Sequence, residues 1–273
     1  MSIGQLKVIH RRPGSRRSRR WKVVVVSSLL IGSSLIAPFV DTPSAFAVPS
    51  CPGSFQYDYV ANDWTPSSNP QGIRSPIVLV TDTTPCNSGS IVTTGIAAGY
   101  IAIDNDAGTK ISQIGFYSYW DPSLSTTTYC KFWAIDGGSP NFYGPCSLDN
   151  NHQTFFKIHT YTSGGSTVYR LDDCSSDSTY GTCTVENADE AEYSNSYAFT
   201  AEETDYGGSS CTVKIMGSSS NHFNIGTSTD GVQGQTTEGG GWSTQNFIYI
   251  PPNCSHYQAN AGNTKMGVWD DRN

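Results

Sequence analysis

Helical patterning is almost absent from this sequence. After residue 47, no long stretch repeats apolar residues at the 3.6-residue period of an amphipathic helix, whereas Ser, Thr, Gly, Asn and Tyr are abundant. A parallel sheet needs helices to cover its faces, so that arrangement is not expected. Internal repeats and linker-like segments are also lacking, and residues 48–273 are interpreted as one domain.

The familiar catalytic and metal-binding motifs are missing too. There is no G-x-S-x-G elbow, no H-E-x-x-H pair and no C-x-x-C pair. Nothing supports a Ser-His-Asp triad. The sequence therefore predicts neither a metal ion nor a cofactor. Histidine is scarce after residue 47, where it occurs only at His152, His159, His222 and His256.

Positive charge is scarce after residue 47. The first 47 residues hold 8 of the 16 Lys and Arg residues but only 1 of the 23 Asp and Glu residues, so the rest has a net charge of 8 − 22 = −14. This charge repels nucleic acids and anionic membrane surfaces, and neither is expected as a partner. It suits an acid environment, where carboxylates become protonated, but it is equally suited to plain solubility. A monomer is expected.

The first 47 residues have the order of a signal peptide. A basic start is followed by an apolar stretch, residues 23–40, and then by the small-residue site Ala45-Phe46-Ala47. A membrane anchor is the alternative, but Ser27, Gly32 and Pro38 interrupt the apolar stretch. We expect export with cleavage after residue 47, which makes the protein secreted.

All of the cysteines follow this cleavage site. An even number of cysteines in an exported chain predicts disulfides, here four. Short separations favour Cys130–Cys146 and Cys174–Cys183, which would leave Cys51–Cys86 and Cys211–Cys254. The eight residues are Cys51, Cys86, Cys130, Cys146, Cys174, Cys183, Cys211 and Cys254.

Strand patterns recur between turn residues throughout the remaining chain. They predict an all-β fold, an antiparallel β-sandwich of the concanavalin or lectin-like jelly-roll type. Residues 163–166, Ser-Gly-Gly-Ser, are expected to form a hairpin loop. Residues 48–90 and 251–273 look less regular and are expected to wrap the sandwich. The predicted strands are 77–81, 99–103, 111–120, 129–135, 154–161, 167–171, 196–205, 212–216 and 247–250.

Two of these strands carry candidate chemistry. In the strand 111–120, the period of two places Gln113, Tyr117 and Tyr119 on one face, which suits a wet groove for an extended ligand. An ordinary exposed face is the competing interpretation. The strand 196–205 carries Glu202 near its middle, where Glu is depleted. A groove would partly desolvate this carboxyl and raise its pKa towards that of an acid–base catalyst.

Three short motifs then occur in a recognisable order: residues 103–104 (Ile-Asp), 111–115 (Ile-Ser-Gln-Ile-Gly) and 201–203 (Ala-Glu-Glu). Together with the aromatic run 129–133, they resemble the eqolisin, or fungal glutamic peptidase, family over roughly residues 95–215. The chain departs from the family pattern at two residues, and its disulfides are additional. Glu203 stands where the family has a tryptophan after its catalytic glutamate, and Tyr100 replaces an earlier tryptophan.

The resemblance implies a secreted endopeptidase acting on polypeptides at acid pH. Glu202 would act as general base on a water molecule, and the amide of Gln113 would stabilise the oxyanion. Glu203 would substitute if the strand register differed by one residue. Tyr117, Tyr119 and Trp133 are expected to line the substrate groove.

Two other functions fit the same composition. A non-catalytic, lectin-like module would bind polysaccharide through aromatic side chains such as Trp120 and Trp242. A structural component of the cell envelope would also suit a disulfide-rich chain with much Ser, Thr and Gly. The peptidase interpretation requires Gln113 and Glu202 to meet over one hollow of the sheet.

Overall fold

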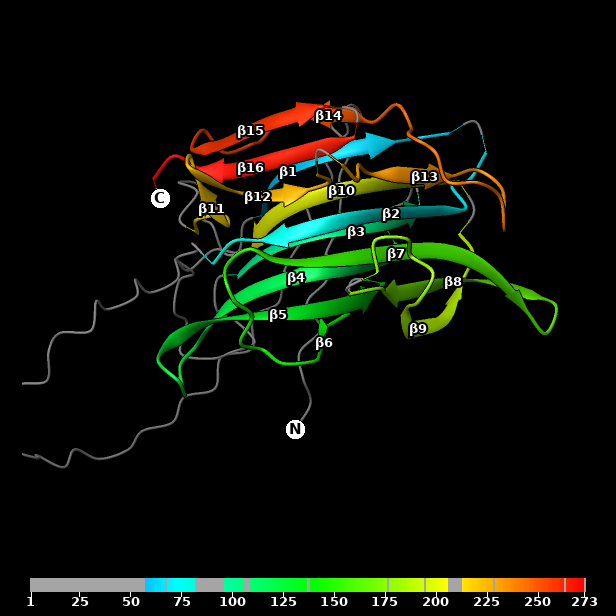
Figure 1. The fold of residues 1–273 in the computed structure, drawn as a ribbon, viewed down its shortest axis with the longest axis horizontal. Helices are drawn as coiled ribbons and strands as arrows, with labels where there is room; N and C mark the ends of the chain where they lie inside the picture. Colours follow the sequence, from blue (N-terminus) through cyan, green and yellow to red (C-terminus); the bar gives the residue numbers. More distant parts are fainter. Residues whose placement is uncertain are drawn as a thin grey trace, which may run out of the picture. The chain divides into compact units, whose positions relative to one another are not determined.

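Two antiparallel β-sheets that pack face to face make up the regular structure (Figure 1). A computed structural model describes residues 57–66, 68–81, 96–105, 109–136, 138–175, 177–193, 195–205, 213–227, 229–262 and 264–272. All of these residues belong to one compact unit. Within them no helix is present, and the predicted all-β sandwich class is confirmed. None of these residues therefore lies in a helix long and apolar enough to cross a membrane.

The first sheet has seven strands within the described residues. Their order across the sheet is β14 (Ile248–Ile250), β1 (Tyr57–Trp64), β10 (Ser196–Asp205), β3 (Ile96–Asn105), β4 (Ile111–Asp121), β5 (Thr126–Ile135) and β6 (Asn141–Tyr143).

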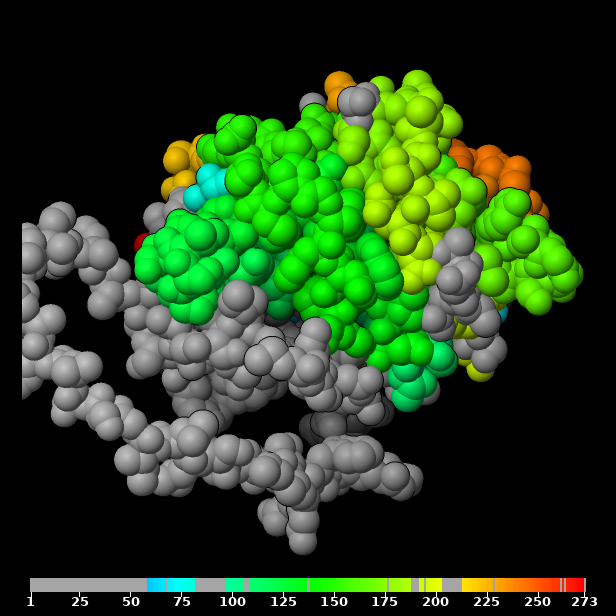
Figure 2. Space-filling view, turned by 90° about the horizontal axis from the view of Figure 1, so that it is seen from below, coloured from blue at the N-terminus to red at the C-terminus, as the bar shows by residue number. Residues whose placement is uncertain are grey.

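The second sheet begins with strands from the C-terminal part of the chain. Its order is β15 (Tyr257–Gly262), β16 (Lys265–Asp270), β12 (Asn221–Ile225), β2 (Gly72–Leu79), β7 (His152–Ser163), β8 (Ser166–Asp173) and β9 (Thr184–Ala191). Two short strands lie off this path: β11 (Gly217–Ser218) pairs with β12, and β13 (Gln233–Gln235) pairs with β2. In Figure 2 the face seen from below is formed mainly by the green and yellow-green segments, which include β5 to β9.

The main core lies between the inner faces of the two sheets. Alternation along the strands turns Ile101 of β3 and Phe156 of β7 towards each other's sheet, where both are fully buried. Phe223 of β12 packs directly onto Gly99 of β3. A Cβ added to Gly99 would lie only 1.9 Å from the phenyl ring. The missing side chain at residue 99 thus makes room for an aromatic ring from the opposite sheet.

The outward-facing side chains of the first sheet form a second apolar layer. Tyr100 is fully buried there, and its ring meets Phe132 and Phe199 edge to face at centroid distances of 6.1 and 5.9 Å. Edge-to-face contacts of this kind are a favourable geometry for aromatic pairs. The first sheet is therefore buried on both faces, unlike a sheet with one open, wet side.

Most predicted strands are present, some with longer ends. The strand predicted for residues 196–205 matches β10, and the one for 111–120 is β4 with one residue added. The prediction of a strand at 212–216 is wrong, since residues 213–216 form none. The segments expected to be less regular contain β1, β2, β15 and β16. For the described residues of these segments that prediction is wrong, and β1 lies inside the first sheet, between β14 and β10. Residues 48–56 and 82–90 lie outside the described part of the chain.

Two predicted disulfides are confirmed, Cys130–Cys146 and Cys174–Cys183. Cys254 is disulfide-bonded as well. The predicted pairs Cys51–Cys86 and Cys211–Cys254 involve residues outside the described part of the chain. The hairpin loop is confirmed: β7 ends at Ser163, β8 begins at Ser166, and the two glycines between them have φ of 60° and 86°. Two positive φ angles are the mark of a tight type I′ turn.

Candidate functional site

The strand register decides where the predicted catalytic pair lies. Gln113 of β4 is opposite Ala102 of β3, which is opposite Phe199 of β10. Glu202 of β10 is instead opposite Gly99 of β3. Residues directly opposite each other project to the same face of a sheet, and alternate residues along a strand project to opposite faces. Gln113 therefore belongs to the outer face and Glu202 to the inner face.

Burial agrees with this register. Glu202 is 0% exposed, and its Oε1 accepts a hydrogen bond of 2.5 Å from the backbone N–H of Met216. Burial raises the pKa of this carboxyl well above its ordinary value. Gln113 is 3% exposed among the aromatic residues of the outer layer, and its Oε1 has no hydrogen-bond partner in the described part of the chain. The structure does not bring the predicted pair together, because the sheet itself separates the two side chains.

The strand register also places the backbone of the substitute acid, Glu203, away from the row of Gln113. Glu203 is opposite Ala98 in the pairing of β10 with β3. Ala98 is four residues along β3 from Ala102, roughly 13 Å at the rise of a strand. The β10 position in line with Gln113 is occupied by Phe199. No carboxylate of β10 therefore stands in the row where a water-activating base is needed.

The predicted groove residues are divided between the two faces. Tyr117 and Tyr119 share the face of Gln113 and both pack against Phe142, whose ring stacks on Tyr119 at 5.4 Å. Trp133 is opposite Ile114 and packs against the core between the sheets. The prediction that Trp133 lines the same groove as the tyrosines is wrong, because it lies one residue out of phase with them.

A different group of polar side chains converges on the outer face of the second sheet. The β7–β8 hairpin places Lys157 opposite Asp172 and His159 opposite Arg170, and β2 adds Arg74 next to Lys157. Three of the eight Lys and Arg residues that follow residue 47 thus gather in two neighbouring rows. We call this group the Arg74 surface; its remaining members are Gly72, Tyr161, Tyr180, Gln233, Gln235 and Trp242.

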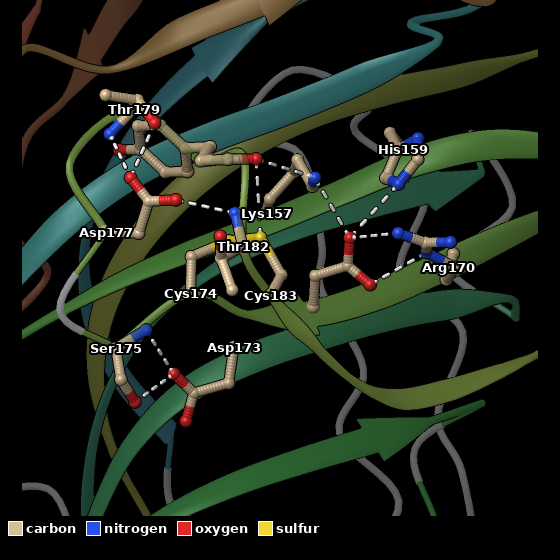
Figure 3. The surroundings of a disulfide bond; sticks show 12 residues. Lys157, His159, Arg170, Asp173, Cys174, Ser175, Asp177, Thr179, Thr182 and Cys183 are labelled. Carbon is tan, nitrogen blue, oxygen red and sulfur yellow. Dashed lines mark hydrogen bonds and ion pairs between the residues drawn. A yellow bond between two sulfur atoms is a disulfide. The ribbon is translucent and has the colours of Figure 1, made fainter.

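A buried carboxylate organises part of the Arg74 surface. Asp172 is 0% exposed and accepts hydrogen bonds from Nε and Nη2 of Arg170 at 2.8 and 3.0 Å. Lys157 Nζ lies 3.1 Å and His159 Nε2 3.2 Å from its Oδ2 (Figure 3). Burial alone would raise the pKa of Asp172, but the hydrogen bonds from His159 and Arg170 and the charge of Lys157 lower it to about 2. One anion thus holds three basic side chains in place.

Arg74 is held differently, between two aromatic rings. Its guanidinium carbon lies 4.4 Å from the ring centre of Tyr180 and 4.8 Å from that of Trp242. Its Nε donates to Oε1 of Gln233 at 2.8 Å. The terminal nitrogens of Arg74 form no hydrogen bond or ion pair with any described residue. The side chain is half-buried, so a fixed guanidinium presents unused N–H groups at the surface.

The Tyr180 ring is fixed by a short, stapled loop. The disulfide Cys174–Cys183 closes the loop, and Asp177 accepts hydrogen bonds from the backbone N–H groups of Thr179 and Thr182 (Figure 3). Tyr180 has φ of 57°, an uncommon backbone angle for a residue with a side chain. The loop therefore imposes the conformation that places this ring against Arg74.

Trp242 is seated over a glycine of the sheet. A Cβ on Gly72 would lie 2.7 Å from the indole Cη2, so only glycine admits the ring at this height. The neighbouring Gln235 is 4% exposed, and its Oε1 has no hydrogen-bond partner. At the other end of the surface, the guanidinium of Arg170 lies 5.5 Å from the ring centre of Tyr161, which is 45% exposed. Arginine and aromatic rings are thus paired twice across three strands.

Comparison with known proteins adds the following. Neither protein-family models nor curated protein sequences match this chain. Among solved structures, the fold is similar to that of scytalido-glutamic peptidase, crystallised with a transition-state analogue inhibitor. The TM-score is 0.46 at 14% sequence identity, over 80% of this chain and 100% of that one. At this identity and score the likeness concerns the fold and carries no conclusion on activity.

The Arg74 surface can bind anions and stack on flat, partly apolar groups, because it combines guanidinium groups with exposed aromatic edges. Among the described residues, no group of three or more His, Cys, Asp or Glu side chains is arranged to hold a metal ion. The surface was missed from the sequence, although a signal for it exists. With a two-residue loop at 164–165, Lys157, His159, Arg170 and Asp172 must pair as neighbours on one face.

Proposed function

We propose that this protein is an exported, non-catalytic module that binds an acidic polysaccharide through the Arg74 surface. The observation that carries the proposal is the guanidinium of Arg74, clamped between Tyr180 and Trp242 with its terminal N–H groups unused. A guanidinium fork matches the two oxygens of a carboxylate. The indole beside it offers a flat ring on which a sugar can stack.

The charge distribution favours an acidic ligand over a neutral one. Arg74, Lys157 and Arg170 face a single carboxylate within the two rows, Asp172, with the further acid Asp230 acting on Arg74 from a distance. Arg74 and Arg170 lie on strands separated by β7, about 10 Å apart across the sheet. Two such guanidinium groups suit a polymer that repeats its acid groups better than a single small anion.

The proposal replaces the peptidase interpretation for a geometric reason. Gln113 and Glu202 lie on opposite faces of their sheet and are both buried. A general base has to come within hydrogen-bond reach, or one water molecule, of the group it activates. The side chains on which the acid peptidase mechanism depended do not meet this condition.

The test is a binding titration of the purified protein with polygalacturonate, with neutral dextran of similar length as the comparison. We expect saturable binding to polygalacturonate that weakens with added salt, and none to dextran. Arg74→Gln should weaken binding at least tenfold, and Trp242→Ala should weaken it comparably. Lys265→Gln, which removes an exposed lysine of β16, is the matched control and should leave affinity unchanged.

Four outcomes would overturn the proposal. The first is equal affinity for polygalacturonate in the Arg74→Gln variant, and the second is no binding by the unaltered protein. Equal binding of polyglutamate, which carries carboxylates without sugar rings, would indicate that the Arg74 surface binds acidic polypeptides instead. Release of peptides from denatured protein at pH 3–4 would restore the peptidase interpretation instead.

A further inference from the structure

Four polar side chains lie inside the sandwich, on the inner face of the neighbouring strands β1 and β10. Asn62 is opposite Thr200, and two residues along the strands Val60 is opposite Glu202. Asp58 follows on the same face of β1, diagonal to Glu202, at a Cα separation of about 7–8 Å. Asp58 is 1% exposed and Glu202 is 0% exposed. Two buried carboxyl groups therefore lie on the same inner face of neighbouring strands in the main core.

These groups have few hydrogen-bond partners. Among the described residues, both carboxyl oxygens of Asp58 and Oε2 of Glu202 have no hydrogen-bond partner, and the same holds for Thr200 Oγ1 and Asn62 Oδ1. The contacts that do exist are the Met216 N–H to Oε1 of Glu202 and the amide of Asn62 to the carbonyl of Gly262. An isolated buried carboxylate costs several kcal/mol unless it is paired or protonated.

No cation is left over to pair with the two carboxyls within the described residues. Arg272, whose charge acts on Asp58, donates to both oxygens of Asp270, which is itself fully buried on β16. Lys214 donates a hydrogen bond to the backbone carbonyl of Arg272 at 2.7 Å. The phenol of Tyr257 donates a hydrogen bond to the backbone carbonyl of Val213 at 2.9 Å. Asp270 adds a further negative charge towards Glu202. Among the described residues, the cluster thus holds three acids, Asp58, Glu202 and Asp270, and one guanidinium, that of Arg272, which is already paired with Asp270.

We infer that Asp58 and Glu202 form an internal proton-binding site that stabilises the folded protein in acid and weakens the packing of β1 and β10 against β15 and β16 at neutral pH. When protonated, a carboxyl can donate to one of the orphaned oxygens beside it, so the proton satisfies groups that the chain leaves unpaired. This inference does not depend on what the Arg74 surface binds.

The titration of the two groups points in the same direction. Burial raises the pKa of Asp58 from 3.8 to about 6, against the opposing charge of Arg272, and burial raises that of Glu202 well above 4.5. Between the unfolded and the folded pKa, the folded protein binds more protons than the unfolded chain, so stability falls as the pH rises and levels off above the folded value. Two pKa units for Asp58 alone correspond to about a 100-fold rise in the unfolding equilibrium constant.

The experiment is urea denaturation of the purified protein at intervals from pH 3.5 to 7.5. The unfolding constant should rise at least 100-fold over this range in the unaltered protein. Asp58→Asn and Glu202→Gln remove the ionisation while keeping the shape, so each should flatten the curve and the double variant should flatten it most. Asp149→Asn, at an exposed acid, is the control and should keep the full slope.

A second measurement covers the possibility that a variant does not fold. Infrared spectra of the unaltered protein at pH 5.5, where exposed carboxyls are ionised, should show a band from protonated carboxyl groups that disappears on unfolding. The inference is overturned if this band is absent, or if the amide variants keep the full slope.

Discussion

The buried carboxylate of Asp172 fixes the positions of three basic side chains. It is the common partner of Lys157, His159 and Arg170, and it is fully buried. Asp172→Asn should lower the free energy of unfolding by about 3–5 kcal/mol at pH 7, because removing one partner leaves buried or half-buried cations without compensation. Urea denaturation at pH 7 measures this. An effect under 1 kcal/mol, the size expected for an exposed ion pair, would contradict this account of Asp172.

Gly99 makes a second prediction at this scale. A methyl group there would overlap the ring of Phe223 from the opposite sheet. Gly99→Ala should therefore destabilise the fold by about 1–3 kcal/mol through overpacking. Trimming the ring in the double variant Gly99→Ala, Phe223→Leu should recover part of that loss, which a double-mutant cycle in urea would detect. Additive losses would mean that the two residues do not share this space.

Single residues also mark the limit of what the sequence could predict. Alternation along β4 correctly grouped Gln113 with Tyr117 on one face of the strand. It could not tell which face of each strand turns towards the other sheet, because the period of two is the same from either side. Nor could it place Phe199 in line with Gln113, since that row depends on the register of three strands.

Elements with clean alternation were the ones predicted well. The Ser-Gly-Gly-Ser loop also located the β7–β8 hairpin, because two consecutive glycines supply the positive φ angles of its turn. Strand β1 was missed because its inner face carries Asp58 and Asn62, both buried, where the pattern calls for apolar residues. Strand β16 was missed for the same reason, because its last residue, Asp270, is fully buried where the pattern calls for an apolar residue.

The hairpin gives a prediction at the element scale. Gly165 has φ of 86°, and a Cβ added there would meet no atom within 4 Å, so a substitution encounters backbone strain and not a clash. Gly165→Ala should cost about 1 kcal/mol, whereas Gly164→Asn should be nearly neutral because asparagine tolerates this turn. Thermal denaturation of the two variants side by side provides the measurement. Equal losses in both would argue against the type I′ geometry.

At the scale of the whole molecule, the two confirmed disulfides should differ in function but not in stability. Cys174–Cys183 holds the loop that carries Tyr180 against Arg74, whereas Cys130–Cys146 joins β5 to a loop of the first sheet. Replacing either pair by serines should cost about 2–3 kcal/mol, since the closed loops are short.

Only the loss of Cys174–Cys183 should also weaken polygalacturonate binding, by several-fold, because Tyr180 would no longer be fixed. Binding titrations on both double-serine variants test this difference. If the two variants lose affinity equally, Tyr180 does not act as a support for Arg74.

The β7–β8 hairpin offers one practical consequence. Its tip, residues 163–166, is exposed, and the space around both glycines is open. Tyr161 lies two residues before the tip on β7, and Arg170 lies four residues after it on β8. A fluorophore attached at the tip would therefore lie beside the end of the Arg74 surface that Tyr161 forms. A fluorophore coupled to a cysteine introduced at the tip would thus report ligand binding as a change in fluorescence, while both sheets stay intact.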